Sequence, residues 1–254
     1  MDGQLTPTAA DRAEAEGSVA PGRCPLCPLQ DLDLGVLKDA LARCEIVSAF
    51  EAPAGARIRI ADYGEGHLLT LHEGLLKFGM THFDGHSAVA GLRYPGDPIE
   101  PYCKLDGGEA FLEAVLDSTI CVIDLQVVER DPGVATRVLT RRLDQVNSLL
   151  RSAERHHSAF IGQPPETRIA ILLLQLLEKP IHRIEPEDGS DRPSIRLFLS
   201  RGEIADCLGL AVETVSRTLG RMVEAGLIAK QGRNRIRIDD LAGLGRRAGL
   251  PPKG

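Results

Sequence analysis

The sequence lacks the features that mark membrane and exported proteins. No apolar run approaches the roughly 18 residues that a membrane-spanning helix needs. The N-terminus has neither the basic start nor the apolar stretch of a signal peptide. The six cysteines are therefore expected to be thiols, ligands or redox sensors rather than structural disulfides. We expect a cytoplasmic protein without a membrane partner.

The sequence also lacks the common signatures of catalysis. It contains no phosphate-binding glycine loop and no evident Ser/His/Asp or paired-carboxylate arrangement. A metal-dependent cupin enzyme is a remote alternative, with His67, His72, His82 or His86 as imidazole ligands. Such sites need an H-x-H pair, which this sequence does not contain. We therefore expect a protein that is not an enzyme.

Basic residues are concentrated near the C-terminus. The 254 residues are 43% hydrophobic and 26% charged, which is ordinary for one large or two modest globular domains. The net charge of -6 argues weakly against indiscriminate binding to nucleic acid. The asymmetry nevertheless predicts a basic C-terminal module on an acidic body. Its basic residues are Arg217, Arg221, Lys230, Arg233, Arg235 and Arg237.

The first half of the chain has the pattern of a β domain. Residues 1–22 are polar and lack periodicity, so we expect a disordered tail there. Between about 46 and 128, short apolar or alternating runs such as "HLLTLHEGLLKFGM" and "STICVIDL" are separated by glycine-containing turns. This spacing is typical of a β-roll, barrel or sandwich. We assign residues 23–130 to this domain.

A long helical pattern begins near residue 132. Apolar residues follow one another at alternating spacings of four and three, as in the seam of a coiled coil. We predict a dimerisation helix over residues 131–162 in a parallel dimer. The alternative is a single amphipathic helix that lies on its own β domain. The predicted seam residues are Leu139, Leu143, Val146, Leu150, Ala153, His157 and Phe160.

The C-terminal residues, 163–254, have the pattern of a winged helix-turn-helix. The run "GQPP" at 162–165 separates this domain from the long helix. In "LSRGEIADCLGL", Ser200 and Glu203 form a capping box, and Gly209 can end the helix. An amphipathic helix with Val212, Val215, Leu219, Met222 and Val223 on its apolar stripe follows, and "LIAKQGRNRIRI" is typical of a hairpin wing.

The polar face of the second helix predicts contacts with DNA. In a helix-turn-helix this helix enters the major groove, where its first turns reach base edges. Arg217 can donate to guanine O6 and N7, and Glu213 can accept from cytosine N4. Basic residues of the wing would contact phosphates. The predicted DNA-binding residues are Glu213, Ser216, Arg217, Arg201, Thr214, Arg221 and Arg235.

The segment "LSRGEIADCLGLAVETVSRTLGRMVEAGLI" resembles the DNA-binding segment of the CRP/FNR superfamily of transcription regulators, and "VETVSR" is similar to the FNR/FixK-like branch. The resemblance covers residues 24–250 and implies an α+β chain: a sensory β-roll of the jelly-roll type, a dimerisation helix and a winged helix-turn-helix. It further implies a homodimer that binds a TTGAT-N4-ATCAA-like palindrome through Glu213, Ser216 and Arg217 and acts on RNA polymerase. One departure is Ala211, where the family has a capping Ser or Thr; losing that cap costs about 1 kcal/mol.

The resemblance also implies a candidate metal site. FNR-type oxygen sensors hold a [4Fe-4S] cluster with three N-terminal cysteines and a fourth in the β-roll. In this sequence Cys24 and Cys27 have the C-x2-C spacing and Cys121 matches the β-roll cysteine, but the third N-terminal cysteine is missing. Zinc binding, a thiol redox role, or no metal at all are the alternatives. A FixK-like regulator without a cluster would be controlled by its abundance or by oxidation of a cysteine. Residues that could complete the set are Cys103, Cys44, Asp31 and Asp33, and Cys207 is the candidate for oxidation.

Two further expectations come from comparison with the family pattern. The stretch "YPGDPIEPYCKLDGGEAF" offers Gly96 and Asp97 but no arginine that could neutralise a phosphate, so no cyclic nucleotide is expected. FNR-like proteins commonly carry an acidic residue in the seam region of Ala153, and this residue resists dimerisation. A neutral Ala153 therefore predicts a relatively strong dimer without a cofactor.

Overall fold

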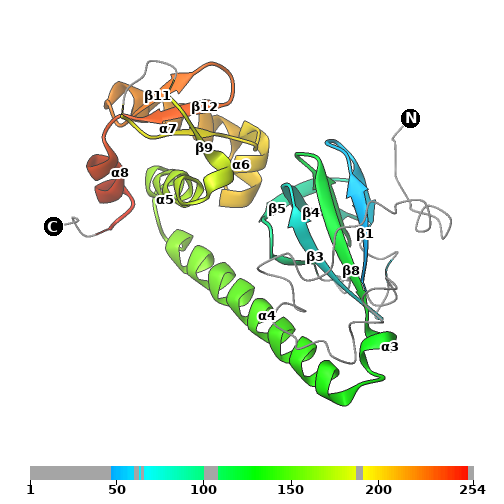
Figure 1. Cartoon of the computed structure of the whole chain (residues 1–254). Helices are drawn as coiled ribbons and strands as arrows, with labels where there is room; N and C mark the ends of the chain where they lie inside the picture. Colours follow the sequence, from blue (N-terminus) through cyan, green and yellow to red (C-terminus); the bar gives the residue numbers. More distant parts are fainter. Residues whose placement is uncertain (1–46, 60–62, 64–65, 100–107, 187–190, 251–254) are drawn as a thin grey trace. The chain divides into compact units, whose positions relative to one another are not determined.

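The computed structural model describes residues 47–59, 63, 66–99, 108–186 and 191–250. The chain divides into two units, residues 1–152 and 153–254 (Figure 1). The architecture is α+β, with a β-sheet domain first and a winged helix-turn-helix last, as the sequence predicts. Within the described residues, no helix is both long enough and apolar enough to cross a membrane.

The β domain consists of two antiparallel four-stranded sheets. The first has the order β1-β8-β3-β6, and the second has the order β2-β7-β4-β5. The strands of the first sheet are β1 Val47–Ala52, β8 Ser118–Asp124, β3 His67–Glu73 and β6 Pro98–Ile99. Those of the second are β2 Arg57–Arg59, β7 Gly108–Ala114, β4 Leu76–His82 and β5 Ser87–Arg93.

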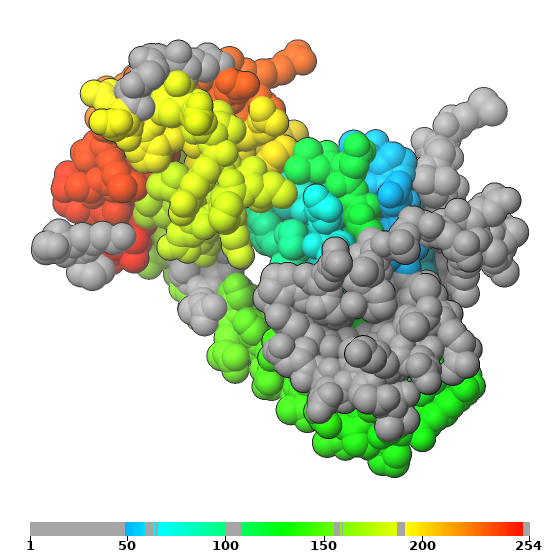
Figure 2. Space-filling view, in the orientation of Figure 1, coloured from blue at the N-terminus to red at the C-terminus, as the bar shows by residue number. Residues whose placement is uncertain are grey.

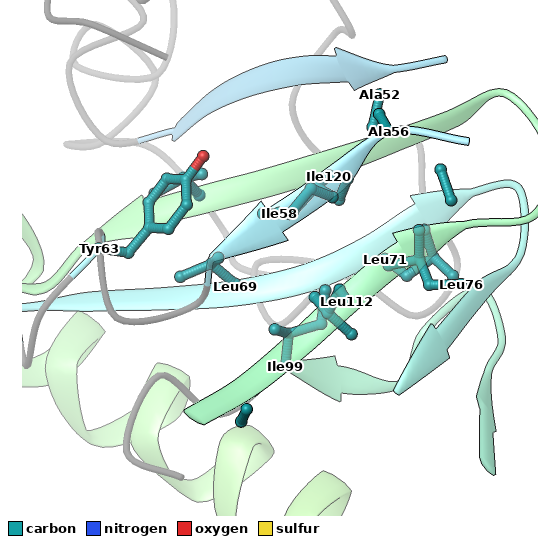
Figure 3. Packing of buried hydrophobic residues seen from close by; sticks show 13 residues of the cluster. Ala52, Ala56, Ile58, Tyr63, Leu69, Leu71, Leu76, Ile99, Leu112 and Ile120 are labelled. Atoms are coloured by element: carbon teal, nitrogen blue, oxygen red, sulfur yellow. The ribbon is translucent and has the colours of Figure 1, made fainter. Parts of the chain in front are cut away.

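The core of this domain lies where the two sheets face each other. Leu69, Leu71 and Ile120 of the first sheet join Ile58 and Leu112 of the second in one buried cluster (Figure 3). Because successive side chains of a strand point to opposite faces, the neighbours of these residues lie on the outer faces of the sheets. On the first sheet these outer residues include Leu68, Thr70, Cys121 and Ile123, and all but Cys121 are buried.

The long helix α4 spans Pro132–Phe160 and follows the short helix α3, Leu125–Val128 (Figure 1). Asp131 begins α4, because its carboxylate accepts from the backbone N–H groups of Gly133 and Val134 at 2.8 and 3.1 Å. Proline at the first helical position has no N–H to leave unpaired. Val134 and Val138 lie one turn apart and are buried, so one stripe of α4 is covered within the chain.

The C-terminal unit combines helices with a small antiparallel sheet of order β11-β12-β10-β9. Its core contains Ile169 and Leu173 of α5, Ile204 of α6, and Val215 and Leu219 of α7. The elements are α5 Pro165–Glu178, η2 Pro180–His182, β9 Arg183–Ile184, β10 Ser194–Arg196, α6 Arg201–Leu208, α7 Val212–Glu224, β11 Ile228–Gln231, β12 Arg235–Ile238 and α8 Leu241–Arg247.

Candidate nucleic-acid interface

The first helix of the motif, α6, is held at both ends. The Ser200 hydroxyl accepts from the Glu203 N–H at 3.3 Å, and the Glu203 carboxylate accepts from the Ser200 N–H at 2.6 Å. This is the predicted capping box. At the other end Gly209 is left-handed, with φ +61°, and the Leu210 N–H donates to the Ala205 carbonyl at 2.9 Å. The turn toward α7 is thereby defined by local interactions.

Arg168 of α5, a residue that no sequence motif indicated, supports this turn. Its Nη1 donates to the Leu208 carbonyl at 2.9 Å, and its Nε donates to the Gln163 carbonyl at 3.0 Å. The cation therefore lies at the C-terminus of α6, where the helix dipole favours positive charge. The sequence indicates this role of Arg168 only weakly, because an arginine early in a helix is usually solvated.

The second helix, α7, presents an apolar inner face. Val215, Leu219 and Met222 are buried, as predicted. Val212 and Val223, which the sequence pattern placed on the same stripe, are instead 42% and 37% exposed. They lie at the first and next-to-last positions of α7, where the neighbouring elements no longer cover the stripe. Ala211 makes no side-chain cap, as its identity predicts.

The outer face of α7 carries the residues predicted to recognise bases. Glu213, Ser216 and Arg217 are exposed, while Thr214 is half-buried. In the part of the chain that the structure describes, the first three side chains form no hydrogen bond or ion pair. Their positions i, i+3 and i+4 place them side by side on one helix face. The Glu213 carboxylate, an acceptor, and the Arg217 guanidinium, a donor, can therefore contact the same binding partner.

Two other arginines predicted to bind DNA lie in different environments. Arg221 is exposed, and its guanidinium donates to the Thr218 hydroxyl at 3.2 Å. Arg201, at the start of α6, is half-buried, and burial lowers its pKa. Its Nη1 is buried without a hydrogen-bond partner among the described residues. A phosphate oxygen would satisfy this donor with a charge-assisted bond.

The wing is a hairpin of β11 and β12, with Gln231 opposite Arg235. Figure 2 shows the orange hairpin projecting from the surface of the C-terminal unit. Lys230 and Arg233 are exposed, and Arg235 is half-buried. These three residues can supply a cationic surface for phosphates.

Arg237 of the same hairpin is engaged elsewhere. Its Nε donates to the Asp239 carboxylate at 2.7 Å, and Arg192 donates to the same oxygen at 3.0 Å. The hydrogen bond from Arg237, together with the smaller contribution of Arg192, holds the pKa of Asp239 below its usual value, against the opposing effect of burial. Arg237 therefore contributes less free charge than its sequence position suggests.

The predicted seam lies mostly on exposed parts of α4. Leu139, Leu143 and Leu150 are 48%, 59% and 55% exposed, Val146 is half-buried and Ala153 is exposed. Phe160 is buried, and the side chain of His157 lies outside the described residues. Exposed leucines in one stripe are unusual for a helix without a partner. The stripe lies beside the covered stripe of Val134 and Val138.

The cysteines are not assembled in the described part of the chain. Cys121 is half-buried on β8, and within the described residues no three His, Cys, Asp or Glu side chains are placed to hold a metal. The scattered histidines proposed for a cupin likewise form no such group there. The other candidate ligands fall outside the described residues: Cys24, Cys27, Cys44, Cys103, Asp31 and Asp33.

Cys207 on α6 is poorly suited to oxidation. Burial raises the pKa of its thiol to about 12, and the charges of Asp206 and Glu203 add to this shift. Since the thiolate is the reactive form, the thiol is expected to be inert near neutral pH. The structure thus argues against control through this residue.

Comparison with known proteins agrees with this geometry. A Crp-like helix-turn-helix domain matches residues 167–247. The chain is 27% identical over 244 residues to a probable transcriptional activator of Rhizobium leguminosarum bv. viciae, covering 95% of this chain and 93% of that protein. It is 26% identical over 179 residues to the anaerobic regulatory protein of Haemophilus influenzae, covering 70% and 67%. FixK2 from Bradyrhizobium japonicum has the same fold, with a TM-score of 0.61 at 20% identity, over 82% of this chain and 100% of that structure.

Proposed function

Because this chain is a transcription regulator of the CRP/FNR superfamily with a helix-turn-helix DNA-binding domain, we propose that it acts as a cytoplasmic homodimer on a TTGAT-N4-ATCAA-like palindrome. The observation that carries this proposal is the exposed set Glu213, Ser216 and Arg217 on α7. These side chains have the donors and acceptors that base edges in the major groove require. RNA polymerase would be the partner on bound DNA.

The flanking cations would supply affinity rather than sequence preference. Arg221 lies on α7 and Arg201 at the start of α6, and Lys230, Arg233 and Arg235 belong to the wing. Contacts from such residues to phosphates release counterions, so binding would weaken as salt increases. Sequence preference would then depend on α7 and general affinity on its surroundings.

The exposed stripe of α4 supports the dimer. Pairing two copies of Leu139, Leu143 and Leu150 would remove three large apolar side chains per chain from water. A two-fold dimer presents two α7 helices to half-sites one DNA turn apart, which matches a palindrome. The dimer is therefore the species expected to bind with high affinity.

The sensed signal would enter through the cysteines of the N-terminal unit. We assign Cys24, Cys27 and Cys121 as iron-sulfur ligands, with Cys103 as the fourth, since thiolates are the ligands that such clusters require. Cluster assembly would bias the seam toward the dimer, and the dimer would align the recognition helices. A bound cluster would supply sensitivity to oxygen. The alternative is a FixK-like regulator without a cluster, which the missing third N-terminal cysteine supports.

Fluorescence anisotropy with labelled DNA tests the DNA-binding proposal. We expect tighter binding to the palindrome than to a scrambled duplex of equal length, measured at the same salt concentration. As a geometric control, inserting about 5 base pairs between half-sites places them on opposite faces of the duplex and should abolish the preference. Equal affinity for all three duplexes would refute sequence-specific binding by an aligned dimer.

Anaerobic purification distinguishes a regulator that holds an iron-sulfur cluster from one that does not. A cluster predicts about four irons and four acid-labile sulfides per monomer, with a brown absorbance that bleaches in air. Cys121→Ser should then lower the iron content. A colourless, iron-free protein that still binds the palindrome would establish the regulator without a cluster.

A further inference from the structure

A buried arginine joins α4 to the outer face of the first β-sheet. Arg142 is only 6% exposed. Its Nη1 donates to the Leu69 carbonyl of β3 at 3.1 Å, and its Nη2 donates to the Ile99 carbonyl of β6 at 3.1 Å. The Thr70 hydroxyl lies 3.5 Å from Nη1. Both carbonyls belong to residues whose side chains lie in the buried core cluster, so the cation is bonded to the backbone of core residues (Figure 3).

Thr70 connects this anchor to Cys121. The two residues are directly opposed in the antiparallel pair of β3 and β8. Directly opposed side chains lie on the same face of a sheet, with Cβ atoms about 5 Å apart. That face is the outer one, which Arg142 approaches. Thr70 therefore lies beside Cys121 and contacts Arg142, so a change at Cys121 can reach Arg142 through this one side chain.

Arg142 also borders the predicted seam. It continues the buried stripe of Val134 and Val138 at i+4 spacing, while Leu139 and Leu143 lie beside it and are exposed. Because both stripes belong to one rigid helix, a rotation of α4 that displaces Arg142 also redirects the two leucines. Nearby, the Gln145 amide donates to the Gly96 carbonyl at 3.4 Å, which adds a second anchor on the same side.

From these contacts we infer that Arg142 is a positioning residue that couples the sheet face around Thr70 and Cys121 to the orientation of the α4 seam. The inference rests on the proposed dimer and specifies how the β domain would control it. When the three acceptors hold Arg142, Leu139 and Leu143 point outward for pairing. A structural change of the sheet face around Cys121 would displace Arg142 and thereby redirect Leu139 and Leu143.

Sedimentation of the full chain tests the role of Arg142. Arg142→Gln should raise the dimer dissociation constant by about tenfold or more, since an uncharged amide cannot bridge both carbonyls. Arg141→Gln is the matched control, because Arg141 is the exposed neighbour and loses the same charge. Arg142→Lys should be intermediate, because it keeps the charge but not the two-carbonyl geometry. Equal effects of Arg141→Gln and Arg142→Gln would overturn the inference.

A double-mutant cycle separates coupling from a merely structural role. Cys121→Val and Arg142→Gln should have non-additive effects on the dimer constant, whereas additive effects would overturn the connection. Thermal unfolding of each variant identifies any that fails to fold, and Thr70→Val, which removes only the hydroxyl acceptor, then replaces Arg142→Gln in the cycle. A wild-type chain that stays monomeric would refute the proposed dimer itself. A wild-type dimer that Arg142→Gln leaves intact would refute only the role of Arg142.

Discussion

Arg168 and Leu208 are joined by a hydrogen bond of 2.9 Å from the guanidinium of α5 to the last carbonyl of α6. The bond lies directly before the left-handed Gly209, where the chain turns toward α7. The orientation of the recognition helix thus depends on a residue of a different helix, 40 positions earlier in the sequence.

The first prediction concerns this bond. Arg168→Met should destabilise the C-terminal unit by about 1 to 2 kcal/mol, because the Leu208 and Gln163 carbonyls lose a charged donor. The variant should also bind the palindrome more weakly, since the turn before α7 is less restrained. Thermal unfolding and anisotropy measure the two effects. Arg168→Lys, which retains the charge, should lose less stability; an unchanged melting temperature in Arg168→Met would contradict the prediction.

The second prediction separates base contacts from phosphate contacts. Arg217→Ala should cost about 1 to 3 kcal/mol on the cognate palindrome and relax base preference at one position. Arg235→Ala should weaken binding to all sequences alike and reduce the slope of log K against log salt by about 1. Titrations on cognate and scrambled duplexes at several salt concentrations distinguish the two patterns. Equal losses on both duplexes for Arg217→Ala would mean that α7 faces the DNA differently.

The third prediction concerns the dimer seam. Ala153→Asp should shift the chain toward monomer by about tenfold or more, because two carboxylates would be brought together at the seam. Ser152→Asp is the matched control: it introduces the same charge at an exposed neighbour outside the seam. Sedimentation at micromolar concentration measures the equilibrium. A wild-type monomer under these conditions would contradict the strong dimer that Ala153 predicts.

The fourth prediction is a pH dependence of stability. His182 is fully buried, donates through Nδ1 to the Arg196 carbonyl at 2.8 Å and packs against the Phe198 ring. Burial lowers its pKa below the ordinary value, and Lys179 adds to this against the opposing backbone hydrogen bond. The unfolded chain therefore binds the proton first as pH falls through about 6.5. The contribution of the neutral, buried His182 to the free energy of unfolding is complete above that pH and is lost as the pH falls below it.

Urea unfolding of the wild type and His182→Asn between pH 5 and 8 measures this effect. Asparagine keeps a donor for the Arg196 carbonyl but does not titrate. The difference in unfolding free energy between the two proteins should shrink as pH falls. A difference that is constant with pH would show that His182 has no lowered pKa in the folded protein.

The fifth prediction concerns Cys207. Because burial raises the pKa of its thiol to about 12, alkylation by iodoacetamide at neutral pH should be slow in the folded chain and fast in urea. Peptide mass spectrometry follows this residue separately from the other cysteines. Cys207→Ala should leave DNA binding unchanged in air. Rapid alkylation of the folded chain would restore Cys207 as a candidate thiol sensor.

Several structural features could be predicted from short stretches of sequence. Ser200 and Glu203 predicted the start of α6 because both partners of the capping box lie within one helical turn. Gly209 predicted its end because only glycine adopts the left-handed conformation at little cost. The polar residues of α7 were placed on its outer face from the helical period alone. Each of these signals is local, so no knowledge of distant packing was needed.

Features that depend on distant packing could not be predicted in this way. The exposure of Val212 and Val223 follows from where the neighbouring elements end, and the helical period contains no such information. Asp239 pairs with both Arg237 and Arg192, and the second of these partners lies more than 40 positions away in the sequence. Such ion pairs neutralise part of the positive charge of the basic C-terminal segment, and the positions of the arginines in the sequence do not reveal this.

The sequence by itself determined the helix-turn-helix, its outward-facing polar set and the apolar stripe of α4, because periodicity, caps and turns are properties of neighbouring residues. Only the tertiary structure decided that Arg142 is buried against β3 and β6, that Thr70 stands between it and Cys121, and that Arg168 supports the turn before α7. These contacts join residues 40 or more positions apart. Their existence depends on how strands and helices pack, because burial is decided by the whole fold.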